Sequence, residues 1–334
     1  MIEIHAPNFD LAKTLNSGQV FHWEKIGGGF CGVIGSEPVY VEQHGDVLQA
    51  IVASASSRSA SVYGQDAHAT ICHYFALDHP LVEICASFPN DPAIGAARES
   101  CRGLRIIRQP KWECLATFIC SSMKQVAHIR QISRKLRERF GEQRKIRLQR
   151  SIQNSCDESA APQTMLMCSA SPTPTSIEQG TARSTNVHAI YTFPAAERIA
   201  LSTEKELREC RLGYRAKNLL ATARLVASCK ANLEKWAALG DNDLRTKLSQ
   251  LPGVGPKIAN CVMLFAYERL RAFPIDVWIQ RVLKEKYFPR ARRLNAARLR
   301  MFTEDYFGEH GGYAQQYLFH HARTNRAGGR RSAP

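Results

Sequence analysis

The hydrophobic pattern divides the chain into two kinds of segment. Over residues 1 to about 55, apolar and polar positions alternate in short runs separated by glycine, as in Val20 to Trp23, Phe30 to Ile34 and Val39 to Val41. A period of two residues predicts strands, so we expect an antiparallel sheet here. From about residue 65 the apolar positions recur every three or four residues, which predicts helices almost to the end of the chain.

Two later segments add detail to this pattern. Residues 112–140 predict a long helical stretch that is interrupted near Ser121 and Ser122. Between about 143 and 187 the periodicity gives way to Gln, Ser, Thr, Ala and Pro, a composition that cannot bury enough apolar surface to become ordered. We interpret residues 143–187 as a low-complexity mobile insertion.

These boundaries predict a division into domains. An N-terminal domain with an antiparallel sheet covers residues 1–88, and a helical core covers 89–142 and 188–325. The basic stretch from Arg323 to Pro334 is expected to be flexible, with a basic tail at 326–334 that can touch a polyanionic partner.

Charge points to a polyanionic partner. The formal net charge is +15, and residues 281–334 alone carry twelve Lys or Arg against four Asp or Glu. Eleven cysteines lie in no repeating frame and no leader sequence opens the chain, so we expect reduced thiols and an intracellular location. No apolar run reaches eighteen residues, so we expect no contact with a membrane.

A glycine turn followed by a lysine is a candidate for phosphate binding. Residues 251–261 are Leu-Pro-Gly-Val-Gly-Pro-Lys-Ile-Ala-Asn-Cys. Gly253 and Gly255, on either side of Val254, can adopt positive φ and bring the backbone close to a bulky anion, and Pro256 suits the first turn of a helix. The free N–H groups at that helix start can hold a phosphate.

Asp276 follows Lys257 by nineteen residues, and the spacing allows the two to meet. A helix over 257–268 is about 18 Å long, and residues 269–275, if extended, reach roughly 23 Å. The chain can therefore return and place Asp276 beside Lys257, with Asp276 as the N-cap of a second helix. The residues alone leave a simpler interpretation open, in which Lys257 is a solvated lysine that touches a phosphate and Asp276 only caps a helix.

Four further segments occur in an order that is typical of one family. They are Asn16 to Trp23, Trp112 to Ser122, Leu212 to Lys217 and Gly312 to Phe319. They resemble the Ser-Gly-Gln-x-Phe-x-Trp element, the first core helix, the DNA wedge loop and the closing helix of the 8-oxoguanine DNA glycosylases, a branch of the helix-hairpin-helix DNA glycosylases. The hairpin itself would lie at about 241–268.

The resemblance implies a fold and a reaction. The fold would be α+β, with an N-terminal antiparallel domain similar to the TATA-binding protein and a mainly α-helical body whose two parts flank the active-site cleft. Lys257 would be the nucleophile and Asp276 its partner, so base removal would be followed by cleavage of the abasic strand through a Schiff base. Because an amine attacks only when neutral, we expect partial burial and the positive helix start to favour the neutral form of Lys257.

The resemblance also implies which residues bind the extruded base. The carbonyl of Gly18 would accept from N7–H, a donor that 8-oxoguanine has and guanine lacks. Phe319 and Cys261 would contact the two faces of the base, and Gln315 its Watson–Crick edge. Taken without the resemblance, Phe319 and Cys261 would be assigned to the core, because both have helical spacing.

Another set of residues would contact the duplex. Tyr214 would fill the gap left by the extruded nucleotide, and Arg215 would offer its donors to the opposite base, which is cytosine in the family. The chain departs from the family at Met123-Lys124-Gln125, where eukaryotic members carry three asparagines, and at His128, where an arginine is expected. These changes leave the preference for cytosine open, with Lys124 as a substitute donor.

The sequence leaves two other functions open. An alkylpurine DNA glycosylase would use Asp276 with water and need no lysine, and a non-catalytic DNA-binding protein would use the hairpin only to hold phosphate. We expect no cofactor and no metal, since the last cysteine is Cys261 and the four-cysteine cluster that endonuclease III relatives carry after the aspartate has no ligands. The expected partner is double-stranded DNA containing oxidised guanine, bound by a monomer.

Overall fold

The N-terminal part of the chain forms one antiparallel sheet, as its alternating pattern predicts. The computed structural model describes residues 1–53, 60–149 and 185–329. The sheet has the strand order β1-β5-β4-β3-β2. Its strands are β1 (Ile2–His5), β2 (Glu24–Ile26), β3 (Gly29–Ile34), β4 (Glu37–His44) and β5 (Val47–Val52).

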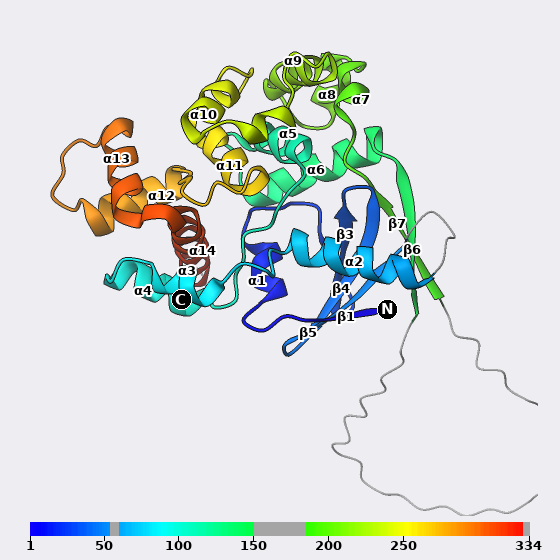
Figure 1. Ribbon diagram of the computed structural model, residues 1–334. Helices are drawn as coiled ribbons and strands as arrows, with labels where there is room; N and C mark the ends of the chain where they lie inside the picture. Colours follow the sequence, from blue (N-terminus) through cyan, green and yellow to red (C-terminus); the bar gives the residue numbers. More distant parts are fainter. Residues whose placement is uncertain (54–59, 150–184, 330–334) are drawn as a thin grey trace, which may run out of the picture.

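One face of this sheet is covered by helix α2 (Ala60–Tyr74), which crosses the strands in Figure 1. Val41 pairs with Ala50 in the register of β4 and β5, and both side chains are buried completely. Tyr74 and Phe75, at the end of α2, pack on this face in the same apolar cluster. The burial of alternate residues is what fixes the register, because a slip by one position would turn the apolar set to solvent.

The expected strand at Val20 to Trp23 is absent, and a short helix, α1 (Leu11–Asn16), precedes this segment. Asp10 caps α1 by accepting from the backbone N–H of Lys13 at 2.8 Å. The segment alternates because Phe21 packs into the helical core while Trp23 packs into the core of the sheet domain. The period of two therefore reflects a chain that runs between two cores and not pairing with a neighbouring strand.

The helices form two groups beside the sheet domain (Figure 1). The first group contains α5 (Lys111–Ser121), α6 (Val126–Phe140), α7 (Ala196–Ala200), α8 (Glu204–Glu209), α9 (Arg215–Ala227), α10 (Asp241–Ser249) and α11 (Pro256–Ala266). The second contains α3 (Leu81–Ala86), α4 (Pro92–Ser100), α12 (Val277–Val282), α13 (Ala296–Phe307) and α14 (Gly311–Gly329). The interruption near Ser121 and Ser122 is confirmed as the break between α5 and α6.

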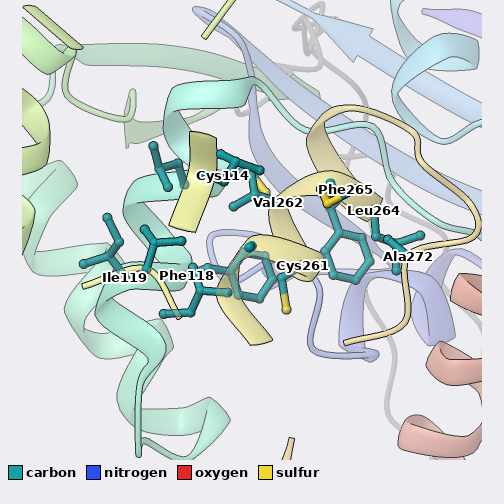
Figure 2. Packing of buried hydrophobic residues seen from close by; sticks show 14 of the residues in the cluster. Cys114, Phe118, Ile119, Cys261, Val262, Leu264, Phe265 and Ala272 are labelled. Atoms are coloured by element: carbon teal, nitrogen blue, oxygen red, sulfur yellow. The ribbon is translucent and has the colours of Figure 1, made fainter. Parts of the chain in front are cut away.

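The packing of α5 against α11 joins the candidate catalytic segment to the core. Figure 2 shows Cys114 and Phe118 of α5 against Cys261 and Phe265 of α11. The rings of Phe118 and Phe265 stack with their centroids 5.6 Å apart. Such close packing fixes the position of α11, because interiors of proteins have little free volume.

The interpretation of residues 143–187 as an insertion without secondary structure is wrong at both ends. Strands β6 (Gln143–Gln149) and β7 (Thr185–Tyr191) pair in antiparallel register, with Ile146 opposite His188. Ile146 is buried completely. The pairing was missed because its partners are far apart in the sequence and rich in polar residues. The middle of the expected insertion, 150–184, lies outside the described residues.

The expectation of a flexible stretch from Arg323 onward places its start too early in the chain. Helix α14 continues to Gly329, so Arg323 lies in its last part, and only residues 330–334 lie outside the described residues. The guanidinium of Arg323 donates to the backbone carbonyl of Asn16, in the loop after α1. This contact holds the end of α14 against the N-terminal domain, so Arg323 belongs to the folded body.

Candidate active site

The glycine turn connects α10 to α11, and its two glycines differ. Gly253 has φ +80°, as expected, and a Cβ there would lie 2.8 Å from Cβ of Asn218. The expectation of positive φ at Gly255 is wrong: its φ is −94°, and it occupies the N-cap position of α11. A Cβ on Gly255 would meet nothing within 4 Å, so the space in front of the helix start is open. Val254, between them, is buried and anchors the turn.

Lys257 lies in the first turn of α11 and is half-buried. Its Nζ donates to Oγ of Ser121 at 3.4 Å and lies 5.0 Å from the centroid of the Phe118 ring. Ser121 Oγ itself donates to the carbonyl of Phe118 at 2.7 Å, which leaves its lone pairs for the lysine. The amine is therefore positioned by α5 as well as by its own helix.

Asp276 is confirmed as the N-cap of α12. Its carboxylate accepts from the backbone N–H of Ile279 at 2.8 Å. Burial raises the pKa of this carboxyl, and the N–H of Ile279 and the charge of Lys257 act in the opposite direction. The carboxylate thus lies close enough to Lys257 for the two charges to interact, as the spacing in the sequence predicts.

Cys261 lies one turn after Lys257 on α11 and is buried. Burial raises the pKa of its thiol to about 11, although the charge of Lys257 lowers it. The thiol is therefore protonated at neutral pH, and it can act as an apolar contact surface but not as a nucleophile. The structure brings together Lys257, Asp276 and Cys261, three residues that the sequence motifs single out.

For three other predicted residues, Gly18, Gln315 and Phe319, we use the name base pocket, after the role that the sequence motifs predict for them. Gly18 has φ +89°, and a Cβ on it would lie 3.1 Å from Cε1 of Phe319. Gln316 of α14 donates to the carbonyl of Ser17 at 3.1 Å and so ties the glycine loop to this helix. Gln315 is buried, and its side-chain oxygen has no hydrogen-bond partner. A buried acceptor without a partner can receive a hydrogen bond from a ligand.

The side chain of Gln19 makes the glycine loop rigid. Its Nε2 donates to the carbonyls of Thr14 and Arg105, and its Oε1 accepts from the N–H of Ile107 at 2.8 Å. All of these groups are buried, so the loop is held from both sides. The carbonyls of this loop are therefore fixed before any ligand enters.

Met123 and Tyr214 form an exposed pair on another part of the surface. Met123 is 91% exposed with φ +53°, and Tyr214 is 51% exposed. The hydroxyl of Tyr214 lies 3.9 Å from Sδ of Met123. Lys124 and His128, which the sequence singles out beside them, are also exposed. Large apolar side chains held together in water are typical of a surface that has a binding partner.

Arg215 differs from the expectation. It is 5% exposed, its Nε donates to the carbonyl of Ser122 at 2.8 Å and its Nη1 to the carbonyl of Leu212 at 3.2 Å. Nη2 also donates to the carbonyl of Ser122, so each of the three guanidinium nitrogens already bonds to a backbone carbonyl of the protein. Arg215 instead holds the loop of Met123 against the loop of Tyr214, and its guanidinium lies 4.4 Å from the centroid of the Tyr214 ring.

Sequence reasoning missed the roles of three residues. Ser121 belongs to a quoted motif, but nothing in its spacing predicts that it holds Lys257. Met123 was noted only as a departure from the family, although an exposed methionine in a loop is a signal in itself. Arg323 was assigned to the tail, and its approach to Gly18 depends on contacts between the two ends of the chain.

Two cavities lie away from Lys257 and Asp276, and His128 is among the residues that line the first. One of about 770 Å³ lies between the segment Phe21 to Ile26, helix α6 and strand β7, and one of about 850 Å³ lies beside Tyr74, Arg108 and Tyr267. Neither contains Lys257 or Asp276. Within the described residues, no helix is long and apolar enough to cross a membrane.

Comparison with known proteins defines the class of this site. The family model of the 8-oxoguanine DNA glycosylase N-terminal domain matches residues 1–115, and the model of the HhH-GPD superfamily of base excision DNA repair proteins matches residues 117–301. The second match covers more than half of the chain and contains Lys257 and Asp276.

Relatives match over nearly the whole length. A "Probable N-glycosylase/DNA lyase" of Methanothermobacter thermautotrophicus is 26% identical, with 97% of this chain and 96% of the relative covered. An "N-glycosylase/DNA lyase" of Saccharomyces cerevisiae is 27% identical, with 95% and 84% covered. The structure of a Clostridium acetobutylicum 8-oxoguanine glycosylase/lyase, solved with duplex DNA containing cytosine opposite 8-oxoguanine, has a TM-score of 0.76 at 26% identity, with 96% and 93% covered.

The chain belongs to the HhH-GPD superfamily of base excision DNA repair proteins and, within it, to the 8-oxoguanine DNA glycosylase family. This confirms the family that the sequence motifs indicate and, with it, the α+β fold of an N-terminal antiparallel sheet domain and a helical body. It also confirms the class of enzyme, an N-glycosylase with DNA lyase activity.

Proposed function

We propose that this protein extrudes 8-oxoguanine opposite cytosine from duplex DNA, removes the base with Lys257 as nucleophile and cleaves the strand by β-elimination. The observation that carries the proposal is the placement of the half-buried amine of Lys257, at the start of α11, near the partly buried carboxylate of Asp276, at the start of α12. The relatives named as N-glycosylase/DNA lyase support it.

In the proposed reaction, the lone pair of Lys257 attacks C1′ as the bond from C1′ to the base breaks, and the base leaves with the bonding electrons and takes up a proton. Asp276 stabilises the positive charge that develops on the sugar. Because burial disfavours the charged form of Asp276, this carboxylate gains more from a neighbouring cation than an exposed one would. Ring opening then gives a Schiff base, and loss of a C2′ proton expels the 3′ phosphate.

Recognition of the base follows from the base pocket. The carbonyl of Gly18, held rigid by Gln19, accepts from N7–H of 8-oxoguanine and opposes the N7 lone pair of guanine. Phe319 contacts one face of the base, Cys261 contacts the other, and Gln315 contacts the Watson–Crick edge. One mismatched hydrogen bond gives about ten- to a hundredfold discrimination, so the remaining selectivity comes from other steps.

Contacts with the duplex come from the exposed elements. Tyr214 enters the gap in the stack, and Met123 beside it adds apolar surface. Lys124 and His128 lie near the opposite strand. The amides at the turn of Gly253 hold a phosphate, and the net charge of +15 contributes further affinity, so binding by this monomer weakens steeply as salt rises.

Reduction by borohydride in the presence of an 8-oxoguanine:cytosine duplex tests the proposal. We expect covalent capture of the wild-type protein, loss of capture in Lys257→Gln and full capture in the control Lys205→Gln, which removes an exposed amine on α8. Base release without capture would instead indicate an alkylpurine-type reaction with water. No release at all would indicate a DNA-binding protein without catalysis.

A further inference from the structure

The guanidinium of Arg323 borders the base pocket and is only partly paired. Its Nη2 donates to the carbonyl of Asn16, and its carbon Cζ lies 5.3 Å from the centroid of the Phe319 ring. A Cβ on Gly18 would lie 2.6 Å from Nη1, so this nitrogen and the glycine almost touch. Arg323 therefore belongs to the same small volume as Gly18 and Phe319.

Nη1 is buried and has no hydrogen-bond partner. A buried polar group without a partner destabilises the protein, and a charged one does so more strongly. The neighbouring charges do not remove this destabilisation: Arg130 is a second cation nearby, and Asp276 interacts with Arg323 electrostatically without forming an ion pair. The donor is therefore available to an acceptor that enters the pocket.

The position of Nη1 defines which acceptor fits. In the proposed complex the carbonyl of Gly18 faces N7 of the purine. Nη1 of Arg323, which lies beside Gly18, then faces the purine atoms on either side of N7. In 8-oxoguanine, N7 lies between two carbonyl oxygens, O6 and O8, and both accept hydrogen bonds. A guanidinium donor next to a carbonyl acceptor thus matches an oxygen next to an N–H group.

We propose that Arg323 is a specificity-determining residue that donates from Nη1 to the carbonyl oxygen beside N7 of the extruded purine. The proposal rests on the proposed function, because it assumes that an oxidised purine occupies the base pocket. Gly18 and Arg323 then form a pair, one acceptor and one donor, that contacts two adjacent atoms of the same edge. Undamaged guanine satisfies at most the donor, since its N7 opposes the glycine carbonyl.

Binding without turnover tests the contact. In a Lys257→Gln background, dissociation constants are measured for duplexes that carry 8-oxoguanine, guanine or a tetrahydrofuran abasic analogue opposite cytosine. We expect Arg323→Met to weaken binding of the 8-oxoguanine duplex about 10- to 100-fold and to change the abasic duplex less than about threefold, because the abasic analogue keeps the phosphates but lacks the oxygen. Arg323→Lys, which keeps the charge, should recover part of the loss.

The matched control is Arg130→Met. Arg130 donates to Oδ1 of Asn16 at 2.8 Å, so it contacts the same loop residue as Arg323. Its substitution by methionine removes the same positive charge. We expect it to affect the three duplexes equally. An equal loss on the 8-oxoguanine and abasic duplexes in Arg323→Met would overturn the proposal in favour of a phosphate contact. Tighter binding of the 8-oxoguanine duplex by Arg323→Met would also overturn the proposal, because it would show that the Arg323 side chain blocks the base pocket.

Single-turnover excision, measured in protein that retains Lys257, identifies whether Arg323 contacts O6 or O8 of the purine. 8-Oxoadenine keeps O8 and N7–H but carries an amino group in place of O6. If Arg323 contacts O6, Arg323→Met slows removal of 8-oxoguanine and narrows its advantage over 8-oxoadenine; if Arg323 contacts O8, removal of both is slowed alike. If Arg323→Met left the removal of both bases unchanged, the proposal for Arg323 would be overturned and the proposed function would stand. Failure of the parent protein to prefer 8-oxoguanine over guanine would overturn the proposed function as well.

Discussion

The catalytic pair and the exposed pair are built in opposite ways. Lys257 and Asp276 are positioned by packed helices, with a cap, a serine hydroxyl and an aromatic ring around them. Met123 and Tyr214 lie on loops and are largely exposed, and their contacts are with each other and, for the Tyr214 ring, with the guanidinium of Arg215. The groups proposed for bond cleavage are fixed in the free protein, whereas those proposed for the duplex remain accessible to a partner.

Because of this difference, experiments can distinguish the contribution of each pair to the chemical step from its contribution to DNA binding. A change in the catalytic pair should reduce the chemical step and leave binding of DNA intact. A change in the exposed pair should do the reverse, because both side chains are largely exposed.

Asp276→Asn should reduce the single-turnover rate of base removal about 100- to 1000-fold, as expected when one electrostatic contact to a developing charge is lost. Binding of the damaged duplex should change little, because asparagine is also a good N-cap and α12 remains formed. The control is Asp91→Asn, since Asp91 caps α4 by accepting from the N–H of Ala93 at 2.8 Å. A loss of binding as large as the loss of rate would contradict the separation.

The same substitution has a predicted effect on stability. Because burial raises the pKa of Asp276 above its usual range, the carboxyl contributes most to stability at low pH and loses that contribution as pH rises. Asp276→Asn should therefore match the wild type near pH 4 and be more stable than the wild type at pH 8, measured by chemical denaturation. A variant that is less stable than the wild type at pH 8 would show that the charged carboxylate stabilises the free protein.

Tyr214→Ala should weaken binding of the damaged duplex about tenfold or more, since contact of an aromatic ring with a base contributes about 1–3 kcal/mol. Met123→Ala should weaken it less and should change the ranking of cytosine, adenine, guanine and thymine opposite the lesion. The control is Met301→Ala, another exposed methionine, which should leave binding unchanged. Equal effects of Met123→Ala and Met301→Ala would remove Met123 from the DNA contact.

The last prediction concerns His320, a buried residue next to Phe319 on α14. Burial and the charge of Arg323 lower its pKa to about 4. A histidine that stays neutral in the fold contributes stability above its ordinary pKa of about 6.5, and this contribution is lost as pH falls towards 4. His320→Gln should reduce the acid sensitivity of unfolding by at most about 3 kcal/mol between pH 7 and 4. The exposed His5→Gln is the control, and an identical pH profile in both variants would contradict the prediction.

Patterns local in the sequence predicted the two-part fold and the family. The strands at Phe30 to Ile34 and Val39 to Val41, the break after Ser121 and the cap at Asp276 each show in residues a few positions apart, so their signals are local. Burial of Arg215, pairing of β6 with β7 and the approach of Arg323 to Gly18 depend on residues far apart in the chain. No periodicity encodes such contacts, which is why arginines assigned to DNA or to a tail turned out to be buried.

Helix α14 separates support from recognition around its own circumference. The hydroxyls of Tyr313 and Tyr317 bond to His79 at 2.8 Å and to the carbonyl of Leu104 at 3.0 Å. Gln315, Phe319 and Arg323 follow one another at intervals of four along a different stripe. Under the proposed function, substitutions of Gln315 and Phe319 would change contacts with the base while the tyrosine hydrogen bonds that hold the helix stay in place, so substrate range could evolve separately from cleavage.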